Sequence, residues 1–332
     1  MTDTKKTVAF FLRHFGERGT EIAVYDYAHY NEAILGNRSL IICFTVESQK
    51  RFLHNDIRLT YPLFQKRFQI LEVERIEDMA GLIQTHTIDA CISLQPGSHE
   101  NHIYKYNDSS IWGSCKTIKL CIFDSRFPEG TTPACISPWL NEKNGTGLPV
   151  LPHIVHLPDV EGDLRQELGI PPDATVFGGY GGRDRFSIAA ARLAVETVAR
   201  HCPHIYFVFA NFNPFCSGLP NVLFLPTILD VERKVKFIQT CDAMLWARDD
   251  GETFGLSIAE FSLKNKPVIC TASGDLAHLR FLGDKAILYK GVDDLCSILT
   301  SFDRVQAANG IWNAYGDFSP EKVMEVFRKL LV

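Results

Sequence analysis

Residues 251–269 read GETFGLSIAEFSLKNKPVI, a stretch that predicts a loop, a helix and a buried strand in succession. Glu252 lies in the loop, between two glycines that allow a tight turn and a close approach of the backbone to a ligand. The helix is expected over 253–264 and carries a second acid, Glu260, among apolar residues. The strand is expected over 267–271. A helix that leads into a buried strand is typical of an α/β protein.

The start of this helix is suited to an anion. The first backbone N–H groups of a helix have no partner within the helix and carry partial positive charge, so a phosphate or diphosphate binds there readily. Glu252 would lie beside that anion. Glu260 would lie two turns into the helix, where a buried carboxylate needs hydrogen-bond donors such as the hydroxyls of a ribose. An ordinary amphipathic helix with two solvent-exposed acids is the alternative.

The two acids and their neighbours resemble a family signature. Seven residues separate Glu252 from Glu260, TFGL (253–256) follows the first acid, and KPVI (266–269) comes shortly after the second. In these residues the sequence resembles the retaining GT-B glycosyltransferases of family 4, also called glycosyl transferases group 1. The resemblance implies that Glu252 contacts the donor sugar and Glu260 the ribose. It places the start of the helix at the diphosphate, with Thr253, Phe254, Gly255 and Leu256.

The resemblance also implies the architecture. GT-B proteins are α/β proteins with two Rossmann-like α/β/α domains whose parallel sheets face each other across a cleft. Residues 141–163 are rich in glycine and proline and predict the linker between such domains. We therefore expect an acceptor-side domain over 1–158, with a last strand at 153–158, and a donor domain over 159–318. A C-terminal helix is expected over 319–332, and in GT-B proteins this helix often returns to the first domain.

Composition and charge narrow the class of protein. A chain of 332 residues is long enough for two domains, and 46% hydrophobic with 22% charged residues is typical of a globular protein. The net charge of −5 argues against a nucleic-acid partner. The ten cysteines include no C-x-x-C pair, and no apolar run reaches the ~18–20 residues that span a bilayer. We expect a cytoplasmic protein without a signal peptide, and contact with a membrane surface stays compatible with these features.

The first half of the chain predicts a parallel sheet. Apolar segments alternate with amphipathic ones, which is typical of a parallel sheet covered by helices on both faces. The expected strands are 8–15, 39–45, 68–73, 88–94, 118–123 and 134–137, and the expected helices are 21–35 and 76–86. Ligands bind such sheets outside the carboxyl ends of the strands, so the loops that follow the strands are candidate sites.

Three loops of the first half carry candidate residues. The first contains His14, Gly16 and Gly19, and the resemblance implies that it helps to bind the acceptor and the diphosphate, although the usual adjacent glycine pair is absent. A plain strand-to-helix turn is the alternative. The polar loop 95–102 is expected at the same edge. The third loop holds Asp124, at about the point where family members often place a histidine beside the reacting sugar, and we expect Asp124 to lie near the reacting groups.

A glycine-rich loop follows the first strand of the second half. Residues 175–185 read TVFGGYGGRDR, and a helix is expected to follow over about 186–200. Gly181 and Gly182 allow backbone N–H groups to converge on an anion, and Arg183 and Arg185 add positive charge in a geometry suited to phosphate oxygens. The resemblance implies that these two arginines bind the donor diphosphate. Surface arginines at a helix start are the alternative.

Two further observations concern the nucleotide. A dinucleotide-binding Rossmann turn would need a third glycine where Asp184 stands. It would also need an acid at the end of the next strand, 205–211, to bind a ribose hydroxyl, and that strand has none. An NAD-dependent oxidoreductase is therefore the lesser alternative. Thr227 and Ile228 follow the strand-like segment 221–227, and the resemblance implies that they contact the nucleotide base. An unliganded turn is the alternative there.

The sequence therefore predicts a glycosyltransferase of hexosyltransferase type. It would move a sugar from a nucleoside-diphosphate sugar to a glycan, a lipid or another acceptor. The resemblance implies retention of the anomeric configuration. The sequence contains no D-x-D motif, so we expect neither a metal ion nor a cofactor. The expected catalytic residues are Glu252, Arg183, Arg185 and Asp124. A non-catalytic GT-B-like protein that binds sugar nucleotides is the alternative function.

Overall fold

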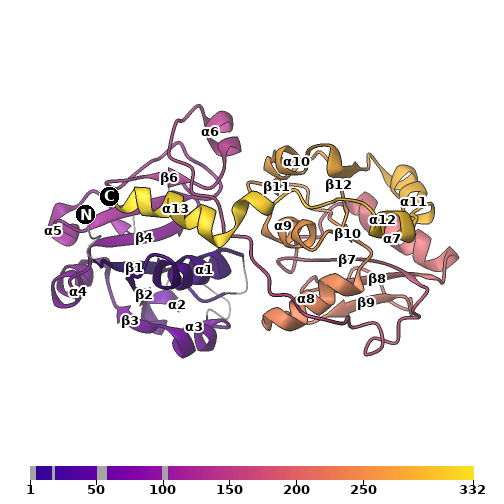
Figure 1. Ribbon diagram of the computed structural model, residues 1–332, viewed down its shortest axis with the longest axis horizontal. Helices are drawn as coiled ribbons and strands as arrows, with labels where there is room; N and C mark the ends of the chain where they lie inside the picture. Colours follow the sequence, from indigo (N-terminus) through magenta and orange to yellow (C-terminus); the bar gives the residue numbers. More distant parts are fainter. Residues whose placement is uncertain (1–4, 17–18, 51–57, 99–103) are drawn as a thin grey trace. The chain divides into compact units, whose positions relative to one another are not determined.

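The chain folds into two compact units. The computed structural model describes residues 5–16, 19–50, 58–98 and 104–332. The first unit comprises Met1–Ile154 and Phe318–Val332, and the second comprises Val155–Asp317 (Figure 1). Each unit contains one six-stranded parallel sheet.

The sheet of the first unit has the strand order β3-β2-β1-β4-β5-β6, and all its pairs are parallel. This is the doubly wound Rossmann order, in which the chain direction across the sheet reverses between β1 and β4. The strands are β1 (Thr7–Leu12), β2 (Arg38–Phe44), β3 (Gln69–Val73), β4 (Ala90–Gln95), β5 (Lys116–Cys121) and β6 (Ala134–Cys135). The helices are α1 (Gly19–Ala33), α2 (Val46–Lys50), α3 (Tyr61–Arg67), η1 (Ile76–Asp78), α4 (Met79–His86), α5 (Ser109–Trp112) and α6 (Pro138–Asn144).

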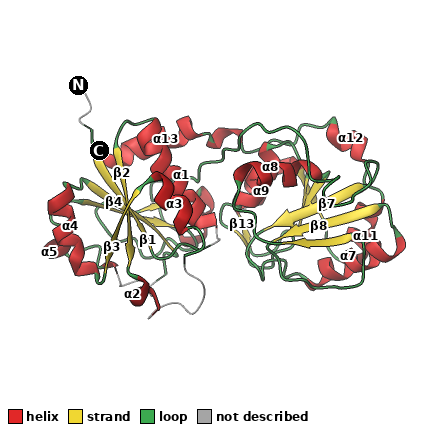
Figure 2. Ribbon diagram, turned by 90° about the horizontal axis from the view of Figure 1, so that it is seen from below, coloured by secondary structure: helices red, strands yellow, loops and turns green. Residues whose placement is uncertain are grey.

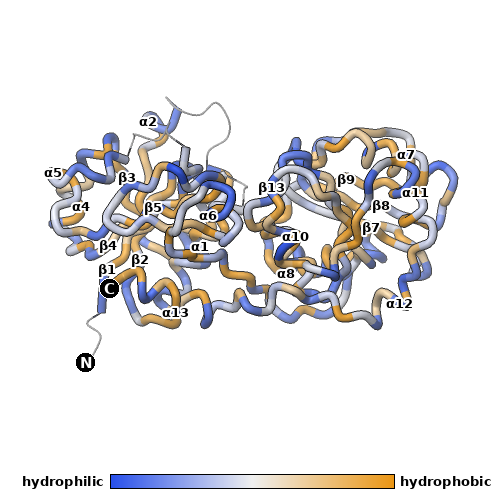
Figure 3. Tube along the Cα trace, turned by 90° about the horizontal axis from the view of Figure 1, so that it is seen from above, coloured by the Kyte–Doolittle hydropathy of each residue, from blue (hydrophilic) through white to orange (hydrophobic). Residues whose placement is uncertain are grey.

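Apolar central strands form this sheet because both of its faces are covered. The register pairs Phe10 of β1 with Ile41 of β2 and Ile92 of β4, and all three side chains are buried. Buried parallel strands are rich in apolar residues on both faces, which is the pattern that the sequence shows here. Figure 3 places the hydrophobic residues along the strands and the hydrophilic ones at the periphery of each unit.

The sheet of the second unit repeats the same topology. Its order is β14-β12-β10-β7-β8-β9, which in chain order is again the Rossmann arrangement, with the reversal between β7 and β10. The strands are β7 (Thr175–Tyr180), β8 (Ile205–Ala210), β9 (Val222–Leu225), β10 (Ala243–Leu245), β12 (Val268–Cys270) and β14 (Ala286–Leu288). A separate two-stranded parallel sheet joins β11 (Gly251–Glu252) to β13 (Asp275–Leu276).

Helices cover both faces of the second sheet. In Figure 2, α8 and α9 lie on one face and α7 and α11 on the other. The helices of this unit are α7 (Ala189–His201), α8 (Val231–Thr240), α9 (Leu256–Leu263), α10 (Ala277–Leu282), η3 (Gly283–Lys285), α11 (Val292–Thr300) and α12 (Arg304–Ala308). The 3-10 turn η4 (Gly316–Phe318) lies where the chain leaves the unit.

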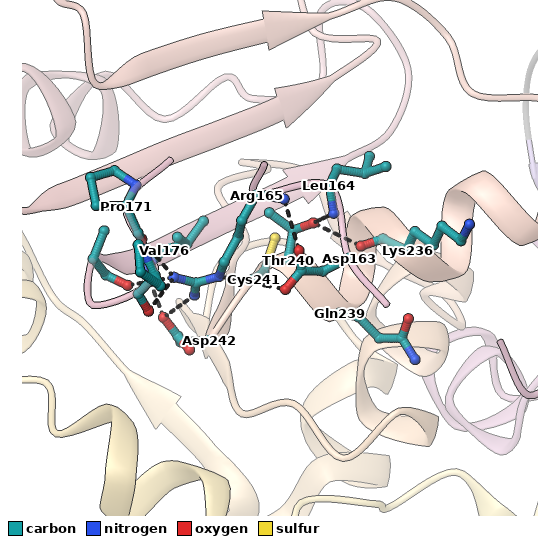
Figure 4. Close-up of polar contacts among 12 residues, drawn as sticks. Asp163, Leu164, Arg165, Pro171, Val176, Lys236, Gln239, Thr240, Cys241 and Asp242 are labelled. Atoms are coloured by element: carbon teal, nitrogen blue, oxygen red, sulfur yellow. Dashed lines mark hydrogen bonds and ion pairs between the residues drawn. The ribbon is translucent and has the colours of Figure 1, made fainter. Parts of the chain in front are cut away.

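The segment that enters the second unit is held at the amino ends of the strands. The Arg165 guanidinium donates to Ala174 O (2.8 Å) and to Asp242 Oδ2 (3.0 Å), which also accepts from Val176 N (2.8 Å). Leu164 N donates to Thr240 Oγ1 (2.8 Å) (Figure 4). Asp242 precedes β10, so this cluster fixes the edge of the sheet opposite to the carboxyl ends.

The C-terminal helix α13 (Pro320–Leu331) belongs to the first unit. Phe327 is fully buried and its ring stacks on Phe10 at 6.1 Å and on Tyr27 at 6.0 Å between ring centroids. Lys116 Nζ donates to Leu330 O (3.2 Å). The apolar face of the helix thus completes the core beside β1 and α1.

Two expected elements differ in the structure. The expected strand at 153–158 is wrong: these residues pair with no strand of the described chain. Pro152, just before the segment, and Pro158, at its end, lack the N–H that a ladder requires. The helix expected from 186 begins at Ala189. Phe186 is instead buried in the apolar core, and Ser187 N and Ile188 N donate to the carbonyl oxygen of Ala247 (2.8 and 3.1 Å).

In the part of the chain that the structure describes, none of the helices combines the length and the apolar character that a bilayer crossing requires.

We predict that Phe327→Ala lowers the free energy of unfolding by about 3–5 kcal/mol, because it removes a fully buried ring and leaves a cavity against Phe10 and Tyr27. Urea unfolding of the full chain, followed by circular dichroism, measures the loss. Lys329→Ala on the exposed face of the same helix is the control and should change stability by less than about 0.5 kcal/mol. Equal effects of the two substitutions would contradict the packing of α13.

Candidate functional site

The carboxyl ends of the second sheet gather most of the expected site residues. The loop after β7 carries Gly181 and Gly182, Thr227 and Ile228 follow β9, and Glu252 lies in the segment after β10. Parallel strands end at one edge of a sheet, and open α/β sheets bind ligands where the strand order reverses. In this sheet the reversal lies between β7 and β10. The loops that follow these two strands carry most of the expected residues and therefore flank the reversal.

Asn211 joins two of these loops. Its side chain donates from Nδ2 to Gly181 O (2.7 Å), and its Oδ1 accepts from Thr227 Oγ1 (2.7 Å). Asn211 has a φ of +60°, a left-handed conformation that asparagine tolerates better than most residues. The glycine loop and the turn after β9 are therefore held in one arrangement.

Four alternately charged side chains connect the glycine loop to the Glu252 segment. Arg185 Nη1 lies 2.7 Å from Asp250 Oδ2, and Arg248 Nη2 donates to the same oxygen at 2.9 Å. Arg248 Nη1 lies 3.1 Å from Glu252 Oε2, and Trp246 Nε1 donates to Glu252 Oε1 (3.3 Å). We call Arg185, Asp250, Arg248 and Glu252 the charge chain. It spans the two loops at the reversal of the sheet.

Arg248 and Glu252 are the more buried members of the charge chain. The side chains of Arg248 and Glu252 are each 16% exposed, against 44% for Arg185 and 49% for Asp250. Burial raises the pKa of Glu252, and Arg248 opposes that rise. Burial disfavours the charged form of Arg248, but Asp250 and Glu252 outweigh it and raise the pKa of the guanidinium. Burial likewise opposes ionisation of Asp250, yet Arg248 and Arg185 hold its pKa below the ordinary value.

A tight backbone contact fixes Glu252. The sequence predicts a loop here, but Glu252 lies on the short strand β11, which pairs with β13 in the register Gly251 to Asp275. Gly251 has a φ of +73°, and a Cβ atom there would lie 2.1 Å from Asp275 N. Gly274, with a φ of +65°, is equally close: its Cβ would lie 2.1 Å from Asp250 C. Only glycines fit this contact.

The helix that follows begins later than expected. Helix α9 starts at Leu256 rather than at 253, and its N-cap is Gly255 in the left-handed conformation with a φ of +86°. Glycine has no side chain that could accept hydrogen bonds from the first turn, so the helix start remains suited to an anion. Thr253 is buried, and Leu256 is half-buried.

Phe254 has a packing role. Its buried ring contacts Phe281 at 5.4 Å and Tyr315 at 5.8 Å between centroids, and its carbonyl oxygen accepts from Tyr315 Oη (3.1 Å). The side chain expected at the donor thus lies in an aromatic cluster, and this residue can offer a ligand only its backbone.

Glu260 lies buried on α9, as its place in the apolar run predicts. The sequence predicts hydrogen-bond donors around this carboxylate. Two side chains from other elements supply them: Tyr180 Oη, at the end of β7, and Lys234 Nζ, on α8. A carboxylate has about four acceptor positions, so these two donors still allow further ones.

The two arginines of the glycine loop differ. Arg185 belongs to the charge chain and is linked to Glu252 through Asp250 and Arg248. Arg183 is exposed, and its backbone carbonyl oxygen accepts from Asn213 N (2.8 Å).

The candidates of the first unit lie at the carboxyl ends of its own sheet. His14 Nε2 lies 3.2 Å from Glu21 Oε1, Gly16 O accepts from Thr60 Oγ1 (3.1 Å), and Gly19 begins α1. These residues follow β1, one of the two strands that flank the reversal of this sheet. The polar loop expected at 95–102 follows β4, the other strand at the reversal, and lies partly outside the described residues.

Asp124 follows β5 and pairs with its neighbour Arg126. The Arg126 guanidinium donates to both oxygens of Asp124, from Nε to Oδ1 at 3.1 Å and from Nη2 to Oδ2 at 2.6 Å. These hydrogen bonds hold the pKa of Asp124 below its ordinary value. Asp124 is thus held as a carboxylate beside an exposed arginine.

Sequence reasoning missed several residues of the second unit. Arg248 and Asp250 stand four and two positions before Glu252, and their alternating charge was a readable signal. Lys234 gave none, because it meets Glu260 only through the packing of α8 beside α9.

In the described residues, groups of three or more His, Cys, Asp or Glu side chains that could hold a metal ion do not occur.

Comparison with known proteins identifies the fold. No protein-family model and no curated protein sequence matches the chain. Solved structures match it along nearly its whole length. A glycosyltransferase from Rickettsia africae ESF-5 is 13% identical with a TM-score of 0.67, and the match covers 99% of both chains. HepE from Anabaena, solved in complex with UDP-glucose, is 17% identical with a TM-score of 0.69, and the match covers 98% of both chains.

A third similar structure is sucrose-phosphate synthase from Thermosynechococcus elongatus. It is 12% identical with a TM-score of 0.62, and the match covers 98% of this chain and 96% of that one. At such identities the likeness concerns the fold. The chain has the α/β fold of GT-B glycosyltransferases, with two parallel six-stranded sheets, as the sequence predicts.

We predict that Gly251→Ala destabilises the protein by about 1–3 kcal/mol more than Gly218→Ala. Both glycines have nearly the same left-handed φ, +73° and +72°, but no described atom lies within 4 Å of a Cβ at Gly218, whereas one at Gly251 overlaps β13. The cost of the conformation, about 1–2 kcal/mol, is therefore common to both variants. Urea unfolding of the two variants measures the difference. An equal loss in both would show that the contact between β11 and β13 yields readily.

Proposed function

We propose that the protein is a glycosyltransferase that moves a sugar from a nucleoside-diphosphate sugar to an acceptor, and that its second unit binds the donor. One observation carries this proposal: within a GT-B fold, a glycine loop with Arg185 and a strand with Glu252 flank the reversal of the second sheet and are linked through the charge chain. Each half of that arrangement offers one component of a donor site, a cation and a carboxylate.

The diphosphate would bind Arg185 and the start of α9. Arg185 is nearly half exposed, so its guanidinium can exchange Asp250 for phosphate oxygens, which it would contact in a bidentate manner. The N–H groups of the first turn of α9 and the backbone of Gly181 and Gly182 would supply further donors. Arg183, in the same loop, is a second candidate for these oxygens.

The sugar and the nucleoside would bind the two glutamates. Glu252, held by Arg248 and Trp246, would accept hydrogen bonds from sugar hydroxyls and fix the orientation of the anomeric carbon. Glu260, which also accepts from Tyr180 and Lys234, would accept hydrogen bonds from the ribose hydroxyls. Thr227 and Ile228 are the proposed contacts of the base.

Transfer would break the bond between the anomeric carbon and the diphosphate oxygen and form a bond between that carbon and the oxygen of an acceptor hydroxyl. The proton of this hydroxyl would pass to the leaving diphosphate or to solvent. Negative charge develops on the leaving nucleoside diphosphate, where Arg185 and the start of α9 would stabilise it electrostatically. We propose that the transfer retains the anomeric configuration and needs neither a metal ion nor a cofactor. The acceptor would be a glycan or a lipid-linked molecule, which the first unit would bind near Asp124 and His14.

The similar HepE structure contains UDP-glucose, which makes UDP-sugars the first donors to test. We predict that the wild type binds one of UDP, GDP or ADP in calorimetry and that Arg185→Ala weakens this binding about 10–100-fold, since a charge-assisted hydrogen bond contributes about 1.5–3 kcal/mol. Arg200→Ala is the matched control, because Arg200 is an exposed arginine on α7 of the same unit that pairs with Glu196. The proposal fails if no nucleoside diphosphate binds, or if Arg185→Ala binds as tightly as Arg200→Ala.

We predict that release of nucleoside diphosphate from the cognate sugar nucleotide persists in excess EDTA, because the proposed electrostatic stabilisation comes from Arg185 and a helix start. A coupled assay measures release, and NMR assigns the anomer of the product. Glu252→Gln is the blank and should lose turnover. Loss of activity in EDTA that Mn²⁺ restores would contradict metal independence, and binding without turnover in the wild type would favour a non-catalytic sugar-nucleotide-binding protein.

A further inference from the structure

Arg248 is the centre of the charge chain. It lies in the segment between β10 and β11, and its guanidinium contacts Asp250 on one side and Glu252 on the other. Only 16% of its side chain is exposed, less than half of the exposed fraction of Arg185. An arginine this buried is held by its partners and cannot reach freely for a ligand in solvent.

The two oxygens of Glu252 are held from the same segment. Oε2 contacts Arg248 and Oε1 accepts from the indole N–H of Trp246. Trp246 is itself buried, and its ring packs on His278 of α10 at 4.6 Å between centroids. The carboxylate is therefore supported by side chains that packing fixes, as a preorganised group must be.

Four other titratable groups near Glu252 are acidic or neutral near pH 7. Asp250 and Asp275, which lies on the paired strand β13, are acids. Burial lowers the pKa of His278 to about 4, so this side chain is neutral near pH 7. Burial raises the pKa of Tyr315 well above its ordinary value, so it is neutral too. In this set of five groups, Arg248 provides the positive charge.

We propose that Arg248 is a positioning residue, which keeps Glu252 ionised and oriented to accept hydrogen bonds from the donor sugar. This inference rests on the proposed function, because it assigns Arg248 a role in the same reaction. Arg248 acts through Glu252 and would not itself contact the reacting atoms.

The reason is the asymmetry of buried ion pairs. Loss of one partner leaves an uncompensated buried charge, which the remaining group relieves by taking up a proton. A protonated Glu252 would carry an O–H donor and would have fewer acceptor positions for sugar hydroxyls. Loss of Arg248 should therefore affect recognition of the sugar more than recognition of the nucleoside diphosphate, since Arg185 and Asp250 remain in place.

The first test needs no ligand. Carboxyl ¹³C NMR of glutamate-labelled protein follows the ionisation of Glu252, whose signal is assigned by its absence from Glu252→Gln. In Arg248→Met the pKa of Glu252 should rise by about one unit or more, because the ionised form loses its cation. Arg248→Lys keeps a positive charge and should restore most of the wild-type value. An unchanged titration of Glu252 in Arg248→Met would overturn the proposal.

The second test measures the reaction. In Arg248→Met, kcat/KM with the cognate sugar nucleotide should fall about 10–100-fold while the Kd for the nucleoside diphosphate changes less than about threefold. The acid limb of the pH profile of kcat/KM should move to higher pH, because a larger fraction of Glu252 is then protonated at a given pH. Arg248→Lys should recover part of kcat/KM, and Arg200→Met should resemble the wild type.

The outcomes separate the two proposals. Equal losses in binding of the nucleoside diphosphate and of the sugar nucleotide would give Arg248 a merely structural role and overturn the inference. If Arg248→Met fails to fold, Arg248→Lys decides: a Glu252 pKa that is raised by about one unit or more in Arg248→Lys, although the positive charge is retained, would overturn the inference. If no sugar nucleotide binds the wild type, the proposed function fails, while the NMR titration still reports whether Arg248 controls Glu252.

Discussion

The second unit depends on a contact between two backbones that only glycine permits. Gly251 and Gly274 each occupy a left-handed conformation, and each leaves no room for a Cβ atom against the segment that carries the other. This contact pairs β11 with β13 and so fixes the direction in which Glu252 leaves the backbone. The charge chain then has a rigid end at Glu252 and a more exposed end at Arg185. In the proposed donor site, the fixed Glu252 would orient the sugar, and the more exposed Arg185 would be accessible to the diphosphate.

The two glutamates of the motif are held by different groups. Glu252 is held by one cation and one indole N–H from the segment just before it. Glu260 is held by a phenol and an ammonium group from β7 and α8, which are distant in sequence. The side-chain partners of Glu252 thus come from its own segment, whereas Glu260 ties three elements of the core together. A change at Glu260 is therefore expected to disturb packing as well as ligand binding.

Sequence patterns were sufficient for the architecture and for one edge of the site. Alternating apolar and amphipathic segments predicted the first parallel sheet, and the resemblance to GT-B glycosyltransferases implied the second. The glycine loop and the glutamate motif were both expected at strand ends, where they lie. The misses have a common cause. The strand β11 is two residues long and pairs with a segment that follows a helix and a strand, so no periodicity announces it. The side-chain partners Lys234 and Tyr180, and the packing of Phe254, arise only when helices and strands meet.

The place of α13 has a consequence for biosynthesis. Phe327 follows Phe10 by 317 residues in the sequence, yet the two rings stack in one core. A ribosome that adds ~5–20 residues per second delivers the second aromatic partner about 15–60 s after the first. The second unit is one continuous segment, Val155–Asp317, and its core has all of its residues before α13 emerges. During translation, the nascent first unit must therefore wait with an incomplete core while the middle of the polypeptide matures.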